Sequence, residues 1–305
     1  MPDEEDGPSM KQTYSFQGER ATGTLYLVAT PIGNLDDMTF RAIETLKSVD
    51  VIAAEDTRQT RKLTSHFGID GPRLISYHEH NKRAKEEVIL DLLREGKHVA
   101  LVTDAGTPGI SDPGADIVRV AVEEGLAVVP LPGAVAGVTA LIASGLPTDR
   151  FTFVGFLPRE KKKRLEDLAW YKNRPETLIF YEAPHRVLDT AKALLEVLGD
   201  RRIVVGRELT KRYEEFARGR LSECVEWLSP KGARGEFVLV VGGMEGKLEV
   251  FDVESQWWEG LNLSEHVERH VESGLSKKDA IKQTAKERGL PKRDVYNAVV
   301  QDADE

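Results

Sequence analysis

A Gly/Pro-rich loop that follows a short apolar run constrains this chain most. The run, Val99–Val102, is unbroken and has the length of a strand covered on both faces of a sheet. The loop, Thr103–Gly114, is followed by apolar residues at helical spacing in Ala115–Glu124. Glycine permits a positive φ and close approach of another molecule, and proline stiffens the loop. We interpret this strand–loop–helix unit as a ligand cradle, with a tight structural turn as the alternative.

Length and composition predict a soluble protein of two domains. The chain has 305 residues, of which 40% are hydrophobic and 30% charged. Its apolar runs are too short to cross a bilayer and its first residues are acidic, which argues against a membrane span and a signal peptide. Cys224 is the single cysteine, so we expect no internal disulfide, a reducing cytoplasmic location and a structural role for this residue.

The charge distribution allows a polyanionic partner. The formal net charge of −9 argues against an evenly basic surface. Two stretches are nevertheless basic: Arg159–Arg174 and Ser276–Tyr296 each hold seven Lys or Arg against three acidic residues. A solvated helix face is the usual explanation of one such run. Two of them in an acidic chain also favour nucleic acid.

The hydrophobic pattern predicts an α/β fold in two domains. After an acidic, aperiodic head at 1–22, which we expect to be disordered, strands and helices alternate, as in parallel sheets with covering helices. We expect one α/β domain at 23–147 and a second at 148–245. The expected strands are Leu25–Ala29, Val51–Ala54, Leu74–Tyr77, Val99–Val102 and Ala127–Leu131, then Phe151–Phe156, Thr177–Glu182, Ile203–Arg207 and Phe237–Val241. Helices are expected between them, among them Lys82–Arg94, Ala134–Ser144, Glu160–Tyr171, His185–Leu198 and Leu221–Leu228.

A small basic helical module is predicted at 255–305. Ser276 and Asp279 have the spacing of a capping box, and Gly289 ends the helix that they begin. Pro291 begins another helix, with Val295 on its apolar stripe. The pair resembles a helix-turn-helix module, so RNA contact and a packing or dimerisation hairpin both remain open.

Two further strand ends repeat the Gly/Pro-rich pattern. They are Leu25–Leu35 and Val129–Ala134, and their loops are predicted at the same edge of a parallel sheet as Thr103–Gly114. Three such loops predict a rim that encloses one small ligand, using mostly backbone groups. None of them matches a phosphate-binding P-loop or the dinucleotide fingerprint, so nucleotide hydrolysis and hydride transfer are not supported.

Polar residues at other strand ends are candidates for chemistry. Glu55 follows a strand directly and suits acid–base work, whereas the adjacent Asp56 suits a helix cap. His78 and His80 share one face of an extended segment, but no matching Cys/His cluster completes a zinc site, so we expect no metal.

Two strand ends of the second domain combine carboxylates with basic groups. These are Tyr181–Arg186 and Arg207–Lys211. Catalysis and an interdomain ion-pair network both require these residue types, and the alternatives stay open.

Together these segments resemble the ribosomal RNA small subunit methyltransferase I family of the tetrapyrrole methylase superfamily. The residues that carry the resemblance are Leu25–Arg58, His78–Asn81, Asp104–Gly114, Gly145–Phe151, Tyr181–Arg186 and Arg207–Glu214. The resemblance implies two α/β domains of the class III methyltransferase type, with S-adenosylmethionine (AdoMet) bound in the cleft between them, in a homodimer. It also implies 2′-O-methylation of a cytidine ribose in 16S rRNA near the decoding centre.

The resemblance further implies where AdoMet binds. Its candidate contacts are Pro31, Gly33, Asp104, Ala105, Gly106, Gly109, Ile110, Gly133, Ala136, Tyr181 and Leu209. Asp112, by contrast, is interpreted as structural. Members of the family commonly have Pro-Ser where this chain has Ala134-Val135, which removes a hydroxyl contact but leaves backbone contacts available.

Methyl transfer to a ribose requires in-line positioning and loss of one proton from the hydroxyl. The candidate bases are Glu182, His185, Lys211 and Glu55.

The RNA-binding candidates are Arg58, His78, His80, Arg159, Lys161, Lys162, Lys163, Arg186, Lys277, Lys278, Lys292 and Arg293. Methylation of a tetrapyrrole or a protein is the first alternative, and a non-catalytic RNA-binding ribosome assembly factor is the second.

Overall fold

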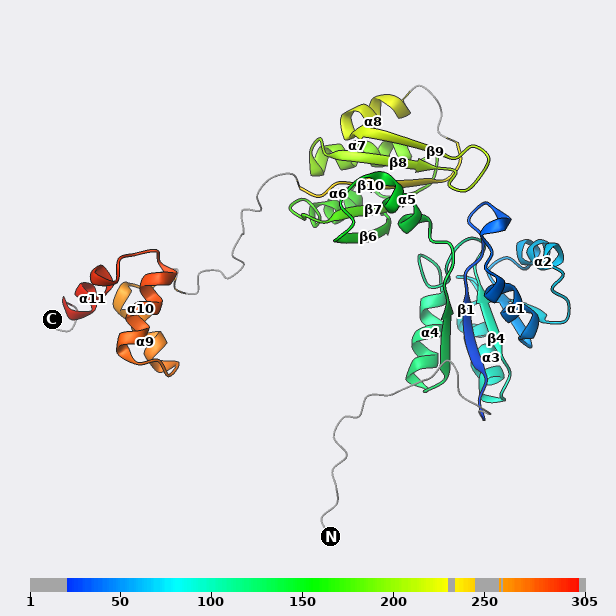
Figure 1. Cartoon of the computed structure of the whole chain (residues 1–305), viewed down its shortest axis with the longest axis horizontal. Helices are drawn as coiled ribbons and strands as arrows, with labels where there is room; N and C mark the ends of the chain where they lie inside the picture. The colour runs from blue at the N-terminus through cyan, green and yellow to red at the C-terminus, as the bar shows by residue number, and fades with distance from the viewer. Residues whose placement is uncertain (1–20, 230–233, 245–257, 259, 302–305) are drawn as a thin grey trace, which may run out of the picture. The chain divides into compact units, whose positions relative to one another are not determined.

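The computed structural model describes residues 21–229, 234–244, 258 and 260–301 (Figure 1). The chain forms two units, 1–245 and 246–305, and the first unit carries two five-stranded sheets. The expected head at 1–22 lies outside the described residues except for its last two, and so do 255–257 of the predicted tail module.

The first sheet is parallel and has helices on both faces, as predicted. Its order is β3-β2-β4-β1-β5. Helices α1 and α2 pack against one face of the sheet, and α3 and α4 pack against the other. Each face has its own apolar core. The bounds are β1 Thr24–Val28, η1 Leu35–Asp37, α1 Phe40–Ser48, β2 Val51–Ala54, α2 Thr57–His66, β3 Arg73–Ser76, α3 Lys82–Arg94, β4 Val99–Val102, α4 Gly114–Glu123 and β5 Ala127–Leu131.

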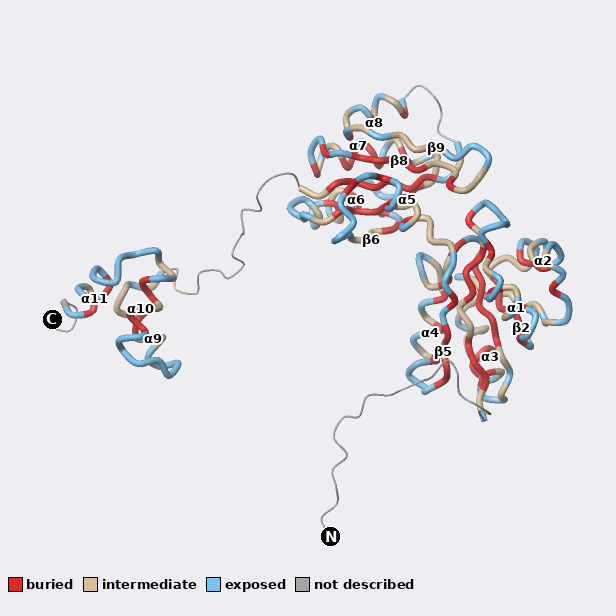
Figure 2. Tube along the Cα trace, viewed as in Figure 1, coloured by how far each residue is buried: buried red, intermediate tan, exposed pale blue. Residues whose placement is uncertain are grey.

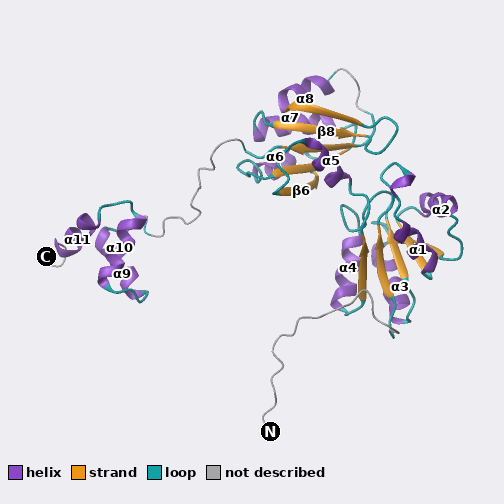
Figure 3. Cartoon of the chain, in the orientation of Figure 1, coloured by secondary structure: helices purple, strands orange, loops and turns teal. Residues whose placement is uncertain are grey.

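Burial on both faces explains why these strands read as unbroken apolar runs. Every residue of β2 and β4 is buried, and both strands lie inside the sheet (Figure 2). The strands β1, β2, β4 and β5 are parallel, so their carboxyl ends lie at the same edge of the sheet, and so do the loops that follow them (Figure 3). That edge positions the candidate site.

The second sheet is mixed, with the order β6-β7-β10-β8-β9. Only β6 and β7 are parallel; β10 is antiparallel to β7 and β8, and β9 is antiparallel to β8. The sequence did not identify β9, a charged edge strand. The bounds are β6 Phe151–Phe156, α6 Lys161–Ala169, β7 Thr177–Glu182, α7 Val187–Leu198, β8 Arg202–Arg207, β9 Glu215–Arg220, α8 Leu221–Leu228 and β10 Phe237–Val241.

Helix α5, Ala136–Ser144, packs on the second sheet although it follows the last strand of the first. Its Ala140 and Leu141 pack with Ile179, Val204 and other residues of β7, β8 and β10. The packing therefore changes from one sheet to the other between β5 and α5, before the boundary that we expected at residue 147. The reason is that α5 covers an apolar sheet face that α6, α7 and α8, on the other side, leave open.

A buried carboxylate fixes the junction between β7 and α7. The Glu182 side chain has no exposed surface. Its Oε1 accepts a hydrogen bond from the Ala183 amide (2.8 Å) and its Oε2 accepts one from Thr190 Oγ1 (2.6 Å). The Arg186 Nε lies 3.3 Å from Oε1. The charge of Glu182 is therefore balanced within the fold.

The C-terminal unit is a three-helix bundle rather than a helix pair. It contains α9 Leu263–Glu272, α10 Lys277–Glu287 and α11 Lys292–Gln301. The predicted cap is confirmed, since Ser276 Oγ accepts a hydrogen bond from the Asp279 amide, and Val295 and Val299 lie in the small core. Among the described residues, no helix has the length and apolar character needed to cross a bilayer.

A His/Glu cluster ties α9 to α10 in this bundle. His266 and His270 each place Nε2 within 2.9 Å of Glu287 Oε2. Although the three side chains are metal-ligand types, Arg288 Nε donates to His266 Nδ1, so the ring proton lies on Nε2 and points to the carboxylate. The cluster is therefore explained as a hydrogen-bond network.

We expect Glu182→Gln to destabilise the first unit by about 3 kcal/mol, because the partly buried Arg186 guanidinium loses its anionic partner. Chemical denaturation followed by circular dichroism measures the free energy of unfolding. Glu196→Gln, which removes an exposed carboxylate from α7, the helix that follows β7, is the control and should change it by less than about 0.5 kcal/mol. Equal stability of the two variants would contradict a structural role for Glu182.

Candidate functional site

Three strand-end loops of the first sheet are joined by direct hydrogen bonds. Thr30, after β1, and Gly106, after β4, exchange two backbone hydrogen bonds of 3.0 Å each. Thr107 Oγ1 donates to the Ala134 carbonyl oxygen, after β5, at 3.1 Å. The loops that the sequence placed at one edge are therefore a single connected rim.

Asp112 holds the longest of these loops in shape. Its carboxylate accepts hydrogen bonds from the amides of Gly109 (2.8 Å), Ile110 (3.0 Å) and Gly114 (2.7 Å). The backbone is left-handed at Gly109 (φ +87°) and, unusually for a residue with a side chain, at Ser111 (φ +65°). The aspartate stabilises a turn that would otherwise be unfavourable, which agrees with the structural role that we assigned to it.

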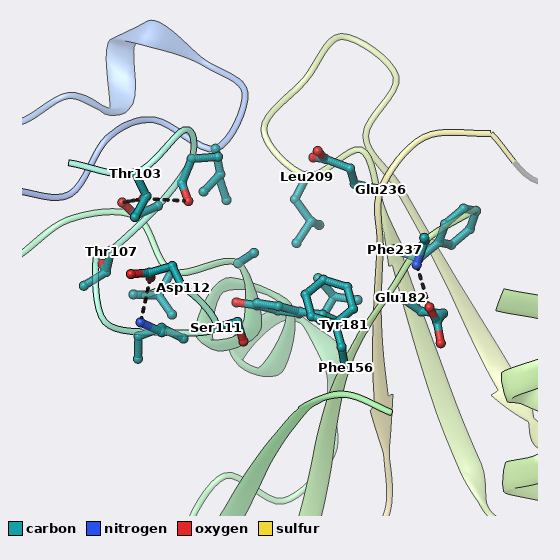
Figure 4. Close-up of a pocket in the computed structure, with 18 of the residues that line it drawn as sticks. Thr103, Thr107, Ser111, Asp112, Phe156, Tyr181, Glu182, Leu209, Glu236 and Phe237 are labelled. Atoms are coloured by element: carbon teal, nitrogen blue, oxygen red, sulfur yellow. Dashed lines mark hydrogen bonds between the residues drawn. The ribbon is translucent and has the colours of Figure 1, made fainter. Parts of the chain in front are cut away.

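A cavity of about 390 Å³ opens between this rim and the strand ends of the second sheet (Figure 4). Its size is in the range typical of small-molecule sites. Apolar side chains and backbone groups make most of its wall. The lining residues are Ile32, Glu55, Thr103, Ala105, Gly106, Thr107, Ile110, Ser111, Asp112, Val135, Ala136, Phe156, Tyr181, Glu182, Ala183, Pro184, Leu209, Glu236, Phe237 and Val238.

Tyr181 connects the two sides of the cavity. Its ring points from β7 toward the loop that carries Ser111 (Figure 4), and its hydroxyl oxygen accepts a hydrogen bond from the Gly137 amide at 2.9 Å. Phe153 and Phe156 pack edge-on against the ring. Burial raises the pKa of Tyr181, and the Gly137 amide only partly offsets this. The phenol is therefore neutral and acts as a rigid wall.

Glu55 is a carboxylate of the cavity wall that makes no ion pair with a described residue. It follows β2, and the Asp104 amide donates a long hydrogen bond of 3.5 Å to it. Burial raises the pKa of Glu55, the nearby charges of Asp104 and Asp112 raise it further, and the Asp104 amide opposes the shift. A carboxylate whose pKa is raised toward neutral pH is a better proton acceptor than an ordinary carboxylate.

The structure brings six of the predicted cofactor contacts to the cavity wall and leaves five off it. Ala105, Gly106, Ile110, Ala136, Tyr181 and Leu209 line the cavity; Pro31, Gly33, Asp104, Gly109 and Gly133 do not. The side chain of Asp104 instead accepts a hydrogen bond from the Asp56 amide. Gly33 and Gly133 are required by packing, since a Cβ would lie 2.5 Å from Lys211 Cγ and 2.4 Å from Ala29 Cβ, respectively.

Three of the four predicted bases are poorly placed for that role. The Glu182 side chain lies on the other side of its strand from Tyr181, in the internal network described above (Figure 4). His185 is exposed and does not line this cavity. Lys211 Nζ binds Glu208 (3.0 Å) and Glu236 (2.9 Å); burial alone would lower its pKa, but these carboxylates outweigh burial and raise it, so the amine stays protonated. Of the four candidates, Glu55 alone lines the cavity without an ion pair to a described residue.

The predicted RNA-binding residues fall into three groups. Arg58 makes a bidentate pair with its neighbour Asp56, and Arg186 is engaged inside the fold, so Arg186 is corrected to a structural residue. His78 Nδ1 is buried with no hydrogen-bond partner among the described residues. The third group consists of exposed side chains, namely His80, Arg159, Lys161, Lys162, Lys163, Lys277, Lys278, Lys292 and Arg293.

Several wall residues escaped the sequence analysis. Phe156, Pro184 and Phe237 line the cavity from the second sheet. Phe156 and Phe237 lie at strand ends, and this position in the sequence could have identified them as residues of the cavity wall. Thr107 and Ser111 lie within the predicted loop but were not singled out, because the pattern does not say which loop side chains face inward.

Comparison with known proteins assigns the family. Residues 24–225 match the tetrapyrrole (corrin/porphyrin) methylases. The chain is 56% identical over 288 residues to ribosomal RNA small subunit methyltransferase I of Halalkalibacterium halodurans, covering 94% of this chain and 98% of that protein. It is 55% identical over 289 residues to the protein of the same name from Bacillus subtilis, covering 95% and 98%.

Solved structures share the fold at low identity. Diphthine synthase matches with a TM-score of 0.56 at 14% identity, over 72% of this chain and 90% of that chain. Uroporphyrin-III C-methyltransferase from Thermus thermophilus, complexed with S-adenosyl homocysteine, matches with a TM-score of 0.51 at 22% identity, over 72% and 97%. The chain therefore belongs to the tetrapyrrole methylase family and, within it, to the ribosomal RNA small subunit methyltransferase I group.

Proposed function

We propose that this chain transfers a methyl group from AdoMet to the 2′-oxygen of a cytidine ribose in 16S rRNA, near the decoding centre. The observation that carries the proposal is the cavity between the three-loop rim and the ends of β6, β7 and β10, in a chain whose relatives are named as small-subunit rRNA methyltransferases. The proposed enzyme acts in the cytoplasm as a homodimer, on rRNA within the small ribosomal subunit.

The wall of the cavity suits AdoMet. Gly106 has φ +84°, and a Cβ there would lie 3.3 Å from Ile32 Cγ2, so a side chain would crowd the cavity wall. Backbone groups of Ala105 and Gly106 suit the polar edges of the ligand, while Ile110, Ala136, Tyr181 and Leu209 supply apolar surface. When bound, AdoMet supplies a methyl group made electrophilic by a positively charged sulfur.

Glu55 is proposed to accept the proton that the ribose hydroxyl loses as its oxygen forms the new bond to carbon. The raised pKa of Glu55 favours proton transfer. The fixed loops contribute by holding the reactants in line, because alignment of two reactants lowers the barrier by several kcal/mol.

The central test of the proposal separates it from both alternatives. We expect calorimetry to show binding of AdoMet by the full chain, and mass spectrometry of rRNA from cells lacking the gene to show the loss of one 2′-O-methylcytidine in 16S rRNA. An assembly factor would give no heat with AdoMet. A tetrapyrrole or protein methyltransferase would bind AdoMet but leave the methylation map of the rRNA unchanged, which would refute our proposal.

We expect Glu55→Gln to lower kcat about a hundredfold while AdoMet affinity is kept, because the proton acceptor is lost. In the parent enzyme kcat should fall as the pH drops through the raised pKa of Glu55, since only the carboxylate accepts a proton. That acidic limb should vanish in Glu55→Gln and persist in Glu236→Gln, a second carboxylate of the cavity wall. Identical pH profiles for Glu55→Gln and the parent would remove Glu55 from the mechanism.

The C-terminal bundle is proposed to bind rRNA through Lys277, Lys278, Lys292 and Arg293, which are exposed. Deleting residues 255–305 should weaken binding to small ribosomal subunits roughly tenfold and reduce its salt dependence, since phosphate contacts release counterions. AdoMet affinity should not change, because the cavity lies wholly in the other unit. Equal affinity with and without the bundle, measured by filter binding across salt concentrations, would contradict this role.

A further inference from the structure

A second cavity, of about 580 Å³, lies on the side of the second sheet that α6 and α7 cover. It differs in chemistry from the first, because charged groups make its wall. The basic members are Arg159, Lys161, Arg164, Arg186 and Lys192, accompanied by His185, and the acidic members are Asp189 and Glu196. The cations outnumber the carboxylates.

Arg164 is the unusual member of this wall. It is only 7% exposed, and its Nε has no hydrogen-bond partner among the described residues. To the residues that the structure describes, its guanidinium makes one long hydrogen bond, from Nη1 to the Arg159 carbonyl oxygen at 3.4 Å. A buried cation left so poorly bonded is costly, and an acceptor supplied by a ligand in the cavity would reduce that cost.

The other basic groups of the cavity wall differ in whether they already pair with a carboxylate of the protein. Arg186 donates to the Leu157 carbonyl oxygen and pairs with Glu182, so it forms part of the wall rather than a ligand contact. Arg159, Lys161 and Lys192 are exposed and make no ion pair with a described residue. These three cations line the cavity together with Arg164, whose planar guanidinium suits a phosphate.

Two segments of the chain, one at the end of β6 and one after β7, contribute residues to both cavities. Phe156 lines the first cavity and Arg159 the second, three residues further along the chain. Likewise Pro184 lines the first cavity and His185 the second. The chain around the end of β6 and the segment that follows β7 therefore contribute to the walls of both cavities.

We propose that the second cavity is a subsite for a backbone phosphate of the RNA next to the nucleotide that is methylated. The inference rests on the proposed function for the identity of the RNA. It assigns Arg164, Lys161, Lys192 and His185 to phosphate binding, and so gives His185 a role in RNA binding rather than in proton transfer.

The test compares two pairs of lysines in the full chain. Lys161→Ala with Lys192→Ala removes two exposed cations of the cavity. Lys162→Ala with Lys163→Ala removes two exposed cations from the same basic run, but from residues that do not line the cavity. The probe is a fluorescein-labelled oligocytidylate, and its affinity is measured by anisotropy between about 50 and 200 mM KCl.

We expect the cavity pair to lose roughly tenfold in affinity and to lower the salt slope by about one relative to the control pair. Inorganic phosphate at constant ionic strength should displace the oligonucleotide from the parent protein, and less well from the cavity variant. Arg164→Gln, checked for folding by circular dichroism, should lower affinity in the same way; if it fails to fold, the lysine pairs decide.

Equal losses in the two lysine pairs, or no loss in the cavity pair, would overturn the subsite. Phosphate binding that depends on the cavity, with RNA affinity unchanged in the cavity variant, would assign the site to free phosphate and overturn the RNA proposal. AdoMet calorimetry and methylation of small subunits by the same parent protein test the proposed function separately. A parent that binds the oligonucleotide through the cavity but methylates no rRNA would refute the function and retain the subsite.

Discussion

The two hydrogen bonds that Thr30 and Gly106 exchange hold the candidate site together. They join the loops after β1 and β4, which are neighbours in the sheet, and Thr107 extends the connection to the loop after β5. Because parallel strands end at one edge, a few loop contacts at that edge suffice to make a rim. On the second sheet, the cavity wall includes Tyr181, whose hydroxyl oxygen accepts a hydrogen bond from the Gly137 amide at the start of α5.

The two cavities differ in the chemistry of their walls and therefore suit different ligands. The first is mostly apolar and uses backbone groups, so it suits a small ligand held by shape. The second is charged and contains an underbonded arginine, so it suits a phosphate. Residues that follow β7 line both cavities: Ala183 and Pro184 the first, and His185 and Arg186 the second.

Much of the fold could be predicted from the sequence. The bounds of β2, β4, β5, β6, β7 and β10 agree with the structure residue for residue, because buried strands read as apolar runs between turn residues. The edge strand β9 was missed, since its charged sequence lacks that pattern. The packing of α5 could not be predicted either, because its apolar residues specify burial but not which sheet supplies the surface.

The site shows the same division. The sequence alone determined that three Gly/Pro-rich loops lie at one sheet edge, because parallel strands end at the same edge. The structural role of Asp112 followed from the family resemblance, and its hydrogen bonds to nearby amides agree with that role. Only the tertiary structure decided which charges are available. Glu182 and Lys211 looked like bases, yet both pair with groups of opposite charge, whereas Glu55 has no ion pair within the described part of the chain. Some of those partners, such as Glu236 for Lys211, lie far along the chain, so their contacts follow from folding and not from local sequence.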